Sequence, residues 1–122
     1  MPQSKTFTYP IEAALAVIGG KWKILILCRL HGDVSRFNEL RRNIPGISQR
    51  MLTQQLRELE RDGIVVRRAY VDHLPRVDYG LTDLGRSLGP VMDMLCDWGQ
   101  HYQEIVQHGS PSAATKKILQ SA

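Results

Sequence analysis

Residues 45–63 read PGISQRMLTQQLRELERDG, and this stretch predicts the helix around which the rest of the fold is arranged. Leu52, Leu56 and Leu59 recur at intervals of four and three residues, which places them on one face of a helix. Ser48 is a suitable N-cap, and Gly63 is a suitable residue just past the C-terminal end. The stretch therefore predicts an amphipathic helix whose leucine face is buried.

The opposite face of this helix has a distinct composition. It carries arginine, glutamine and threonine and no acid, while Glu58 and Glu60 lie on its flanks; its residues are Arg50, Thr53, Gln54, Arg57 and Arg61. Such side chains hydrogen-bond to base edges and phosphates in a major groove of DNA. A solvated helix face is the alternative interpretation. The face therefore predicts DNA recognition only if the neighbouring sequence supports it.

The charge distribution of the neighbouring sequence supports DNA recognition. The chain has 122 residues and a net charge of +4. Residues 36–76 contain nine arginines and no lysine against five acidic residues, so the whole excess of four lies in this segment. A localised arginine excess is typical of binding to a polyanion.

The sequence before residue 45 predicts three further helices. Residues 11–19 and 21–30 are strongly apolar, and Ser35 is expected to cap a short helix over residues 36–43, in which Phe37, Leu40 and Ile44 form the buried side. Two short helices joined by a few residues that include glycine make a helix-turn-helix, here residues 35–62. In such units the second helix, here residues 48–62, enters the groove.

After Gly63 the apolar period changes to that of strands. Residues 64–71 and 76–81 are expected to pair as a hairpin around a turn at residues 72–75. A helix-turn-helix followed at once by a hairpin, here residues 64–81, is a winged helix. Thr82 is then expected to N-cap one long helix over residues 82–107, in which Pro90 introduces a kink.

This last predicted helix has more apolar surface than so small a domain can cover, so we expect it to pack against a second subunit. Packing onto the first helix is the alternative. Residues 109–122 lose the period and are expected to be a flexible tail, which leaves one domain over residues 9–108.

Over residues 9–99 the sequence resembles the HxlR-type winged-helix regulators of bacteria, within the MarR-like superfamily. The matching segments are IGGKWKILIL (18–27), RFNELRRNIPGISQRMLTQQLRELERDGIV (36–65), PRVDYGLTDLGRSL (75–88) and the Trp98-Gly99 pair. The resemblance implies a mainly α fold with a small β-hairpin and extra N- and C-terminal dimerisation helices. It also implies a homodimer that presents two recognition helices and two wings to a double-stranded DNA operator.

The resemblance further implies a response to small electrophiles, aldehydes, oxidants or metabolites. Many relatives carry a sensing cysteine immediately before the proline of the first helix, but this sequence has Tyr9-Pro10 there. We therefore expect a dimeric, sequence-specific DNA-binding transcriptional regulator, either repressor or activator, modulated by a small molecule or a redox signal. A winged-helix protein-interaction module without specific DNA binding is the alternative.

We predict that eight residues contact DNA. Ser48 sits where its hydroxyl and backbone N–H meet a phosphate, and Arg76 is expected to reach the minor groove or its phosphates from the wing. Arg67 and Arg68 alternate in the first wing strand, so only one of them points towards DNA. The predicted contacts are Arg36, Ser48, Gln49, Arg50, Thr53, Gln54, Arg57 and Arg76.

Other site chemistries have little support in the sequence. Cys28 and Cys96 are candidate sensors, but packing is the simpler role for both: Cys28 is expected to be a buried small hydrophobe, and Asp97 disfavours a Cys96 thiolate. Trp22, Trp98 and Tyr102 are either core residues or the lining of an effector cavity. We find no metal-ligand spacing, no cofactor motif and no catalytic constellation, so no enzyme is expected. Without a secretion signal or a membrane span, we expect a cytoplasmic protein, associated with the nucleoid when bound to DNA.

Overall fold

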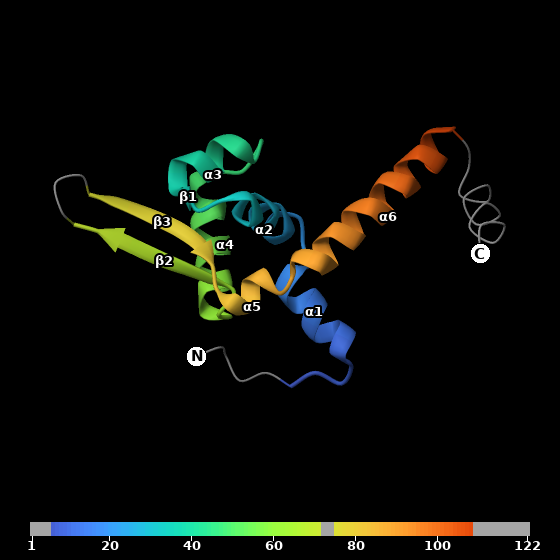
Figure 1. Cartoon of the computed structure of the whole chain (residues 1–122), viewed down its shortest axis with the longest axis horizontal. Helices are drawn as coiled ribbons and strands as arrows, with labels where there is room; N and C mark the ends of the chain where they lie inside the picture. Colours follow the sequence, from blue (N-terminus) through green and yellow to red (C-terminus); the bar gives the residue numbers. More distant parts are fainter. Residues whose placement is uncertain (1–5, 72–74, 109–122) are drawn as a thin grey trace. The chain divides into compact units, whose positions relative to one another are not determined.

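The computed structural model describes residues 6–71 and 75–108. The predicted tail and all of the predicted turn except Pro75 lie outside these described residues. The chain divides into two compact units, residues 1–89 and 90–122, and each is described by itself (Figure 1). Within residues 6–71 and 75–108, no helix is long and apolar enough to cross a membrane.

The first unit contains helices and a small sheet, as the sequence predicts. Its two N-terminal helices, its helix-turn-helix and both wing strands begin and end within two residues of their expected limits. The elements are α1 (Pro10–Ile18), α2 (Trp22–Gly32), β1 (Ser35–Arg36), α3 (Phe37–Asn43), α4 (Gln49–Arg61), β2 (Val65–Tyr70), β3 (Arg76–Leu81) and α5 (Asp83–Arg86).

Helix α4 has the caps and the buried face that its sequence predicts. The Ser48 hydroxyl accepts a hydrogen bond from the Met51 N–H at 3.0 Å, and Gly63 has a φ of 76°, a left-handed conformation that suits glycine. Leu52, Leu56 and Leu59 are at most 1% exposed. The other fully buried side chains come from α2, α3, β2 and the turn after α3; they are Ile26, Leu27, Leu40, Ile44 and Val65. The core therefore forms around the apolar face of α4.

The start of α3 differs from the sequence prediction. Ser35 is not the N-cap; Arg36 is, and its backbone N–H donates to Glu39 Oε1 at 3.0 Å. Ser35 and Arg36 instead form strand β1, which pairs with Tyr79 and Asp78 of β3. The sheet thus has three antiparallel strands in the order β1-β3-β2 rather than the two of the expected hairpin. The extended backbone before an N-cap has free N–H and C=O groups, and β3 pairs with them.

The wing, which we define as strands β2 and β3, is tied to the end of α4. Val65 pairs with Leu81 at its base and Tyr70 with Arg76 at its far end. Thr82 connects the two sides: its hydroxyl donates to the Gly63 carbonyl oxygen at 2.6 Å, and its N–H donates to the Ile64 carbonyl oxygen at 3.1 Å. The wing therefore leaves α4 and returns to α5 at the same point.

The predicted helix over residues 82–107 is two helices, so that expectation was wrong. Thr82 does act as an N-cap, accepting from the Gly85 N–H at 3.0 Å, but α5 ends at Arg86. The long helix α6 runs over Gly89–His108. Pro90 explains the break, because a helix continuing through it would lack a hydrogen-bond donor and would bring the proline ring against the residue 86 carbonyl group.

Gly85 makes the closest approach of α5 to the base of the wing. A Cβ atom at this position would lie 2.3 Å from the Ile64 carbonyl oxygen, which is a backbone atom. We expect Gly85→Ala to lower the free energy of unfolding by about 1–3 kcal/mol, because the backbone must shift. Gly32→Ala is the matched control, since a Cβ there meets nothing within 4 Å. Urea denaturation would show both effects, and equal stability of the two variants would contradict the prediction.

Helix α6 begins the second unit and exposes much apolar surface. Its exposed large apolar side chains are Val91, Met94, Leu95, Trp98, Tyr102 and Val106. The Trp98 and Tyr102 rings are stacked, with their centroids 5.3 Å apart. Trp98 is 59% exposed, so these aromatic residues are not core residues of the single chain.

Candidate nucleic-acid interface

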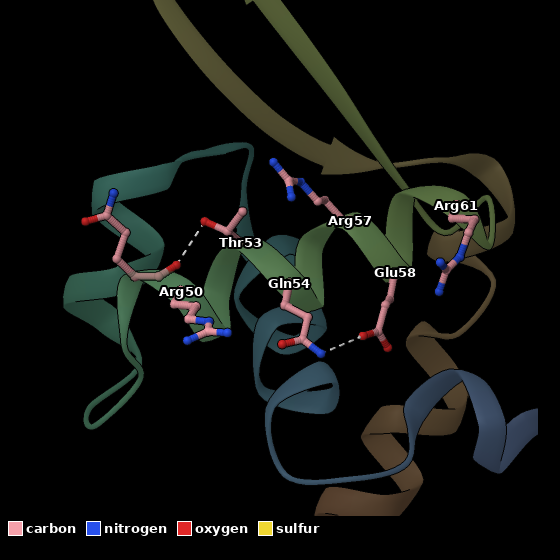
Figure 2. Close-up of a pocket in the computed structure, with 7 residues that line it drawn as sticks. Arg50, Thr53, Gln54, Arg57, Glu58 and Arg61 are labelled. Atoms are coloured by element: carbon pink, nitrogen blue, oxygen red, sulfur yellow. Dashed lines mark hydrogen bonds between the residues drawn. The ribbon is translucent and has the colours of Figure 1, made fainter.

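The exposed side of α4 brings together most of the residues predicted to contact DNA. They line a shallow hollow along the helix, and Figure 2 shows six of the seven labelled on the α4 ribbon. The lining residues are Gln49, Arg50, Thr53, Gln54, Arg57, Glu58 and Arg61. Because the leucines on the other side are buried, these side chains are held outward by the core. We call this set the recognition surface.

Hydrogen bonds restrain part of the recognition surface. The Thr53 hydroxyl donates to the Gln49 carbonyl oxygen at 2.9 Å, a bond within the helix. This leaves the threonine methyl group and the polar groups of its neighbours for contact with a ligand. Ser48 caps the N-terminus, where backbone N–H groups favour an anion. The surface is thus able to meet both phosphates and base edges.

Glu58 was expected on the flank, but it lines the recognition surface. Its Oε1 accepts from Lys23 Nζ of α2 at 2.7 Å, and its Oε2 lies 3.4 Å from Gln54 Nε2. The Lys23 side chain is 13% exposed and that of Glu58 27%. The recognition surface therefore contains one carboxylate whose charge is balanced from behind by a lysine of the neighbouring helix. The i, i+4 spacing of Gln54 and Glu58 was the signal in the sequence for this placement.

The Lys23–Glu58 pair makes the stability of the chain depend on pH. The hydrogen bond from Lys23 is the main cause that lowers the pKa of the Glu58 carboxyl from its ordinary value of 4.5; partial burial opposes it, and the Gln54 amide adds to it. A carboxyl with a lowered pKa in the folded state stabilises the fold above its unfolded pKa. That stabilisation is lost as the pH falls through the lowered value.

We therefore expect the stability difference between the wild type and Lys23→Met to be largest near pH 7 and to shrink below about pH 4.5. Urea denaturation from pH 7 to pH 3 measures it. Lys21→Met removes a lysine that lies over the Trp22 ring rather than beside a carboxylate, so its effect should not follow this pH dependence. A Lys23→Met difference that is constant over this range would contradict the prediction.

Two other predicted contacts, Arg36 and Arg76, lie apart from the recognition surface. Both face Asp78 of β3, with Nε–carboxylate distances of 4.0 Å for Arg36 and 3.4 Å for Arg76. The Arg76 guanidinium also lies 4.3 Å from the Tyr70 ring centre. Asp78 is not among the residues predicted from the sequence, although its i, i+2 spacing from Arg76 on a strand places the two on one face. Asp78 and Tyr70 together hold Arg76 at the far end of the wing.

The sequence left open whether Arg67 or Arg68 lies on the side of the recognition surface, and the structure distinguishes the two. Arg67 lines a hollow together with Gln49, Thr53 and Arg57, so it lies beside the recognition surface. Arg68 pairs with Asp78 in the sheet and lines a hollow on the other face with His31. Arg67 is therefore the member of the pair that adds positive charge next to α4.

The two cysteines are both exposed in the single chain. The expectation that Cys28 is buried was therefore wrong. Helix α2 directs Ile26 and Leu27 into the core. Cys28 instead lines a hollow with Leu25, Arg29 and Pro45. Cys96 lies on α6. Among the residues that the structure describes, no group of three or more His, Cys, Asp or Glu side chains could hold a metal ion.

Comparisons with known proteins agree with this architecture. The family described as HxlR-like helix-turn-helix matches residues 17–107. The chain is 45% identical over 117 residues to the uncharacterized HTH-type transcriptional regulator YtcD of Bacillus subtilis strain 168, covering 96% of this chain and 93% of YtcD. It is 51% identical over 92 residues to an uncharacterized HTH-type transcriptional regulator of Methanothermobacter thermautotrophicus, covering 75% and 70%.

Solved structures give the same result. The redox regulator HypR in its reduced form superposes with a TM-score of 0.77 and 46% identity, covering 82% of this chain and 99% of that one. Helices α2, α3 and α4 and the wing thus form a winged helix-turn-helix of known type. The chain belongs to the HxlR-like helix-turn-helix family and is a DNA-binding transcriptional regulator.

Proposed function

We propose that the chain acts as a homodimer that binds a two-fold DNA operator, with α4 of each protomer in a major groove and each wing beside it. The observation that carries this proposal is the recognition surface: arginine, glutamine and threonine side chains held outward on a helix whose other face is fully buried. Such groups match the donor and acceptor pattern of base edges. The contacts we assign are Ser48, Gln49, Arg50, Thr53, Gln54 and Arg57 from the helix-turn-helix, and Arg36 and Arg76 from the sheet.

The DNA-binding part of the proposal is tested by fluorescence anisotropy. A labelled duplex from the region upstream of the gene is compared with a scrambled duplex over a series of salt concentrations. We expect the genuine duplex to be preferred by about 10³-fold or more, with affinity falling as salt rises. Equal affinity for both duplexes would exclude this region as the operator. Absence of binding at low salt would favour the protein-interaction alternative.

The dimeric part rests on exposed apolar side chains of both terminal helices. Ile11 and Leu15 are exposed on α1, and Met94 and Trp98 on α6. Exposed apolar surface of this kind is typical of subunit contacts. We expect sedimentation to give twice the mass of one chain, and Trp98→Lys to shift the population towards the monomer. Val71→Lys, which changes an exposed residue just after strand β2, is the control. A wild type that sediments as a monomer would contradict the proposal.

We also propose that a small molecule or a redox signal modulates DNA binding. HypR, one of the similar structures, is described as a redox regulator, and this chain exposes Cys28 and Cys96. Binding to the operator is measured with the thiols reduced and after treatment with diamide, in the wild type, Cys28→Ser and Cys96→Ser. A response that one of the serine variants abolishes identifies the sensing thiol. An unchanged affinity in the wild type would leave a small molecule as the signal.

A further inference from the structure

Three side chains form a series of contacts that runs from helix α2 to the recognition surface. Lys23 of α2 donates to Glu58 Oε1 at 2.7 Å, and the Gln54 amide nitrogen lies 3.4 Å from Glu58 Oε2. Figure 2 shows Gln54 and Glu58 pointing to the same side of α4, while Arg57 points towards the strands. Lys23 is the least exposed of the three side chains, so it is the end of this series of contacts that is most fixed by packing.

The chemistry of Glu58 decides how the Gln54 amide is oriented. A carboxylate has only acceptor atoms, so the group that faces it must be the amide nitrogen and not the amide oxygen. Lys23 holds the Glu58 carboxylate in place by donating to Oε1, and this directs Oε2 at the Gln54 amide. One N–H of Gln54 is therefore engaged by Glu58. The amide oxygen and the second N–H remain for a ligand.

We propose that Lys23 is a positioning residue that acts through Glu58 to orient the Gln54 amide, so that this protein prefers adenine to guanine at one base pair of each half-site. The proposal rests on the DNA-binding function proposed above. Adenine presents an N6 amino donor and an N7 acceptor in the major groove, which match the amide oxygen and the second N–H. Guanine presents O6 in place of the amino group, and this oxygen would face the amide oxygen.

A simpler role for the pair is to brace α4 against α2. Bracing alone predicts that loss of Lys23 lowers stability and lowers affinity for all duplexes by the same factor. Orientation of the amide predicts a selective loss, because a Gln54 amide that can rotate offers its N–H groups to guanine O6 as readily as its oxygen to adenine N6. The ratio of affinities for two duplexes that differ in one base pair therefore separates the two roles.

The experiment uses the full chain and an operator obtained by selection from randomised duplexes. Gln54→Ala identifies the base pair at which the preference depends on Gln54. Dissociation constants are then measured for the adenine and guanine versions with the wild type, Lys23→Met and the control Lys21→Met, after circular dichroism has shown that each is folded. We expect a preference for adenine of about 10-fold or more in the wild type and Lys21→Met, and below about 3-fold in Lys23→Met.

A second variant keeps the size of the side chain at position 58. In Glu58→Gln, we expect Lys23 to donate to the oxygen of the amide at position 58. The nitrogen of that amide then faces Gln54. The Gln54 amide is expected to turn so that its oxygen accepts from this nitrogen. We expect the preference at this base pair to shift from adenine towards guanine.

The outcomes separate the inference from the proposed function. A wild type that selects no sequence from the pool would overturn the proposed function and, with it, this inference. A wild-type adenine preference that persists unchanged in both Lys23→Met and Glu58→Gln would overturn the inference alone. An equal loss of affinity for both duplexes in Lys23→Met would also overturn it, in favour of bracing.

Discussion

Leu52→Ala is expected to lower the free energy of unfolding by about 2–5 kcal/mol, a large share of the stability of a domain of this size. Leu52 is fully buried, at 0% exposure, on the face of α4 that packs into the core. Removing its side chain loses buried apolar area and leaves a cavity that the packed neighbours fill only in part. Urea denaturation followed by circular dichroism measures the change.

Leu84→Ala is the matched control for this prediction. It makes the same change at a leucine of α5 that is 56% exposed, where we expect an effect within about 0.5 kcal/mol. Similar losses of stability in the two variants would show that the α4 face does not organise the core. Leu52→Ala should also weaken DNA binding at temperatures where it is partly unfolded, and recover it on cooling.

Arg57→Ala is expected to reduce the preference for the operator by roughly 10- to 100-fold, which corresponds to about 1–3 kcal/mol for one lost base contact. Arg57 lies in the middle of the recognition surface and points towards the strands, next to the hollow that Arg67 lines (Figure 2). The loss should appear in the ratio of affinities for genuine and scrambled duplexes, measured by anisotropy at one salt concentration.

Arg76→Ala serves as the comparison because Arg76 lies at the far end of the wing. A phosphate contact contributes to both duplexes, so we expect weaker binding to each and a salt dependence whose slope falls by about one. An Arg57→Ala protein that binds both duplexes more weakly by the same factor would assign Arg57 to the backbone as well. The two variants together assign one role to the helix and another to the wing.

Local sequence patterns were enough to predict most elements of the first unit. The leucine spacing of α4, its serine cap and the glycine after it are all properties of a short segment. They are confirmed by the buried leucines, the Ser48 hydrogen bond and the left-handed backbone of Gly63. The limits of β3 at Arg76 and Leu81 follow from strict alternation in the same way. Elements that one segment specifies by itself were therefore predictable.

Most of the differences between the predicted and the observed structure arise where a residue contacts another residue that is far away in the sequence. Strand β1 has only two residues, and it exists because β3 pairs with it from more than 40 positions later. The spacing of Glu58 from Gln54 was a local signal for its place on the helix, but its ion pair is with Lys23, 35 residues before it. Cys28 sits within an apolar run, yet the direction in which α2 turns it is set by packing. Pro90 was a local signal for the break before α6, but a proline at this position is compatible with either a kinked helix or two separate helices.

The bonds from Thr82 to Gly63 and Ile64 give the intervening segment two ends that meet at one point. When the two ends of a segment are bonded to each other, a change in the length or motion of the segment has little effect on the positions of the elements outside it. Val65 lies in the core, and Asp78 and Tyr79 pair with β1, but the outer end of the wing, where Tyr70 pairs with Arg76, makes neither contact. We therefore expect changes at this outer end to leave the direction of α4 and the start of α5 unchanged. We expect this outer end to be the part of the wing whose sequence diverges with the operator at least cost to the rest of the first unit.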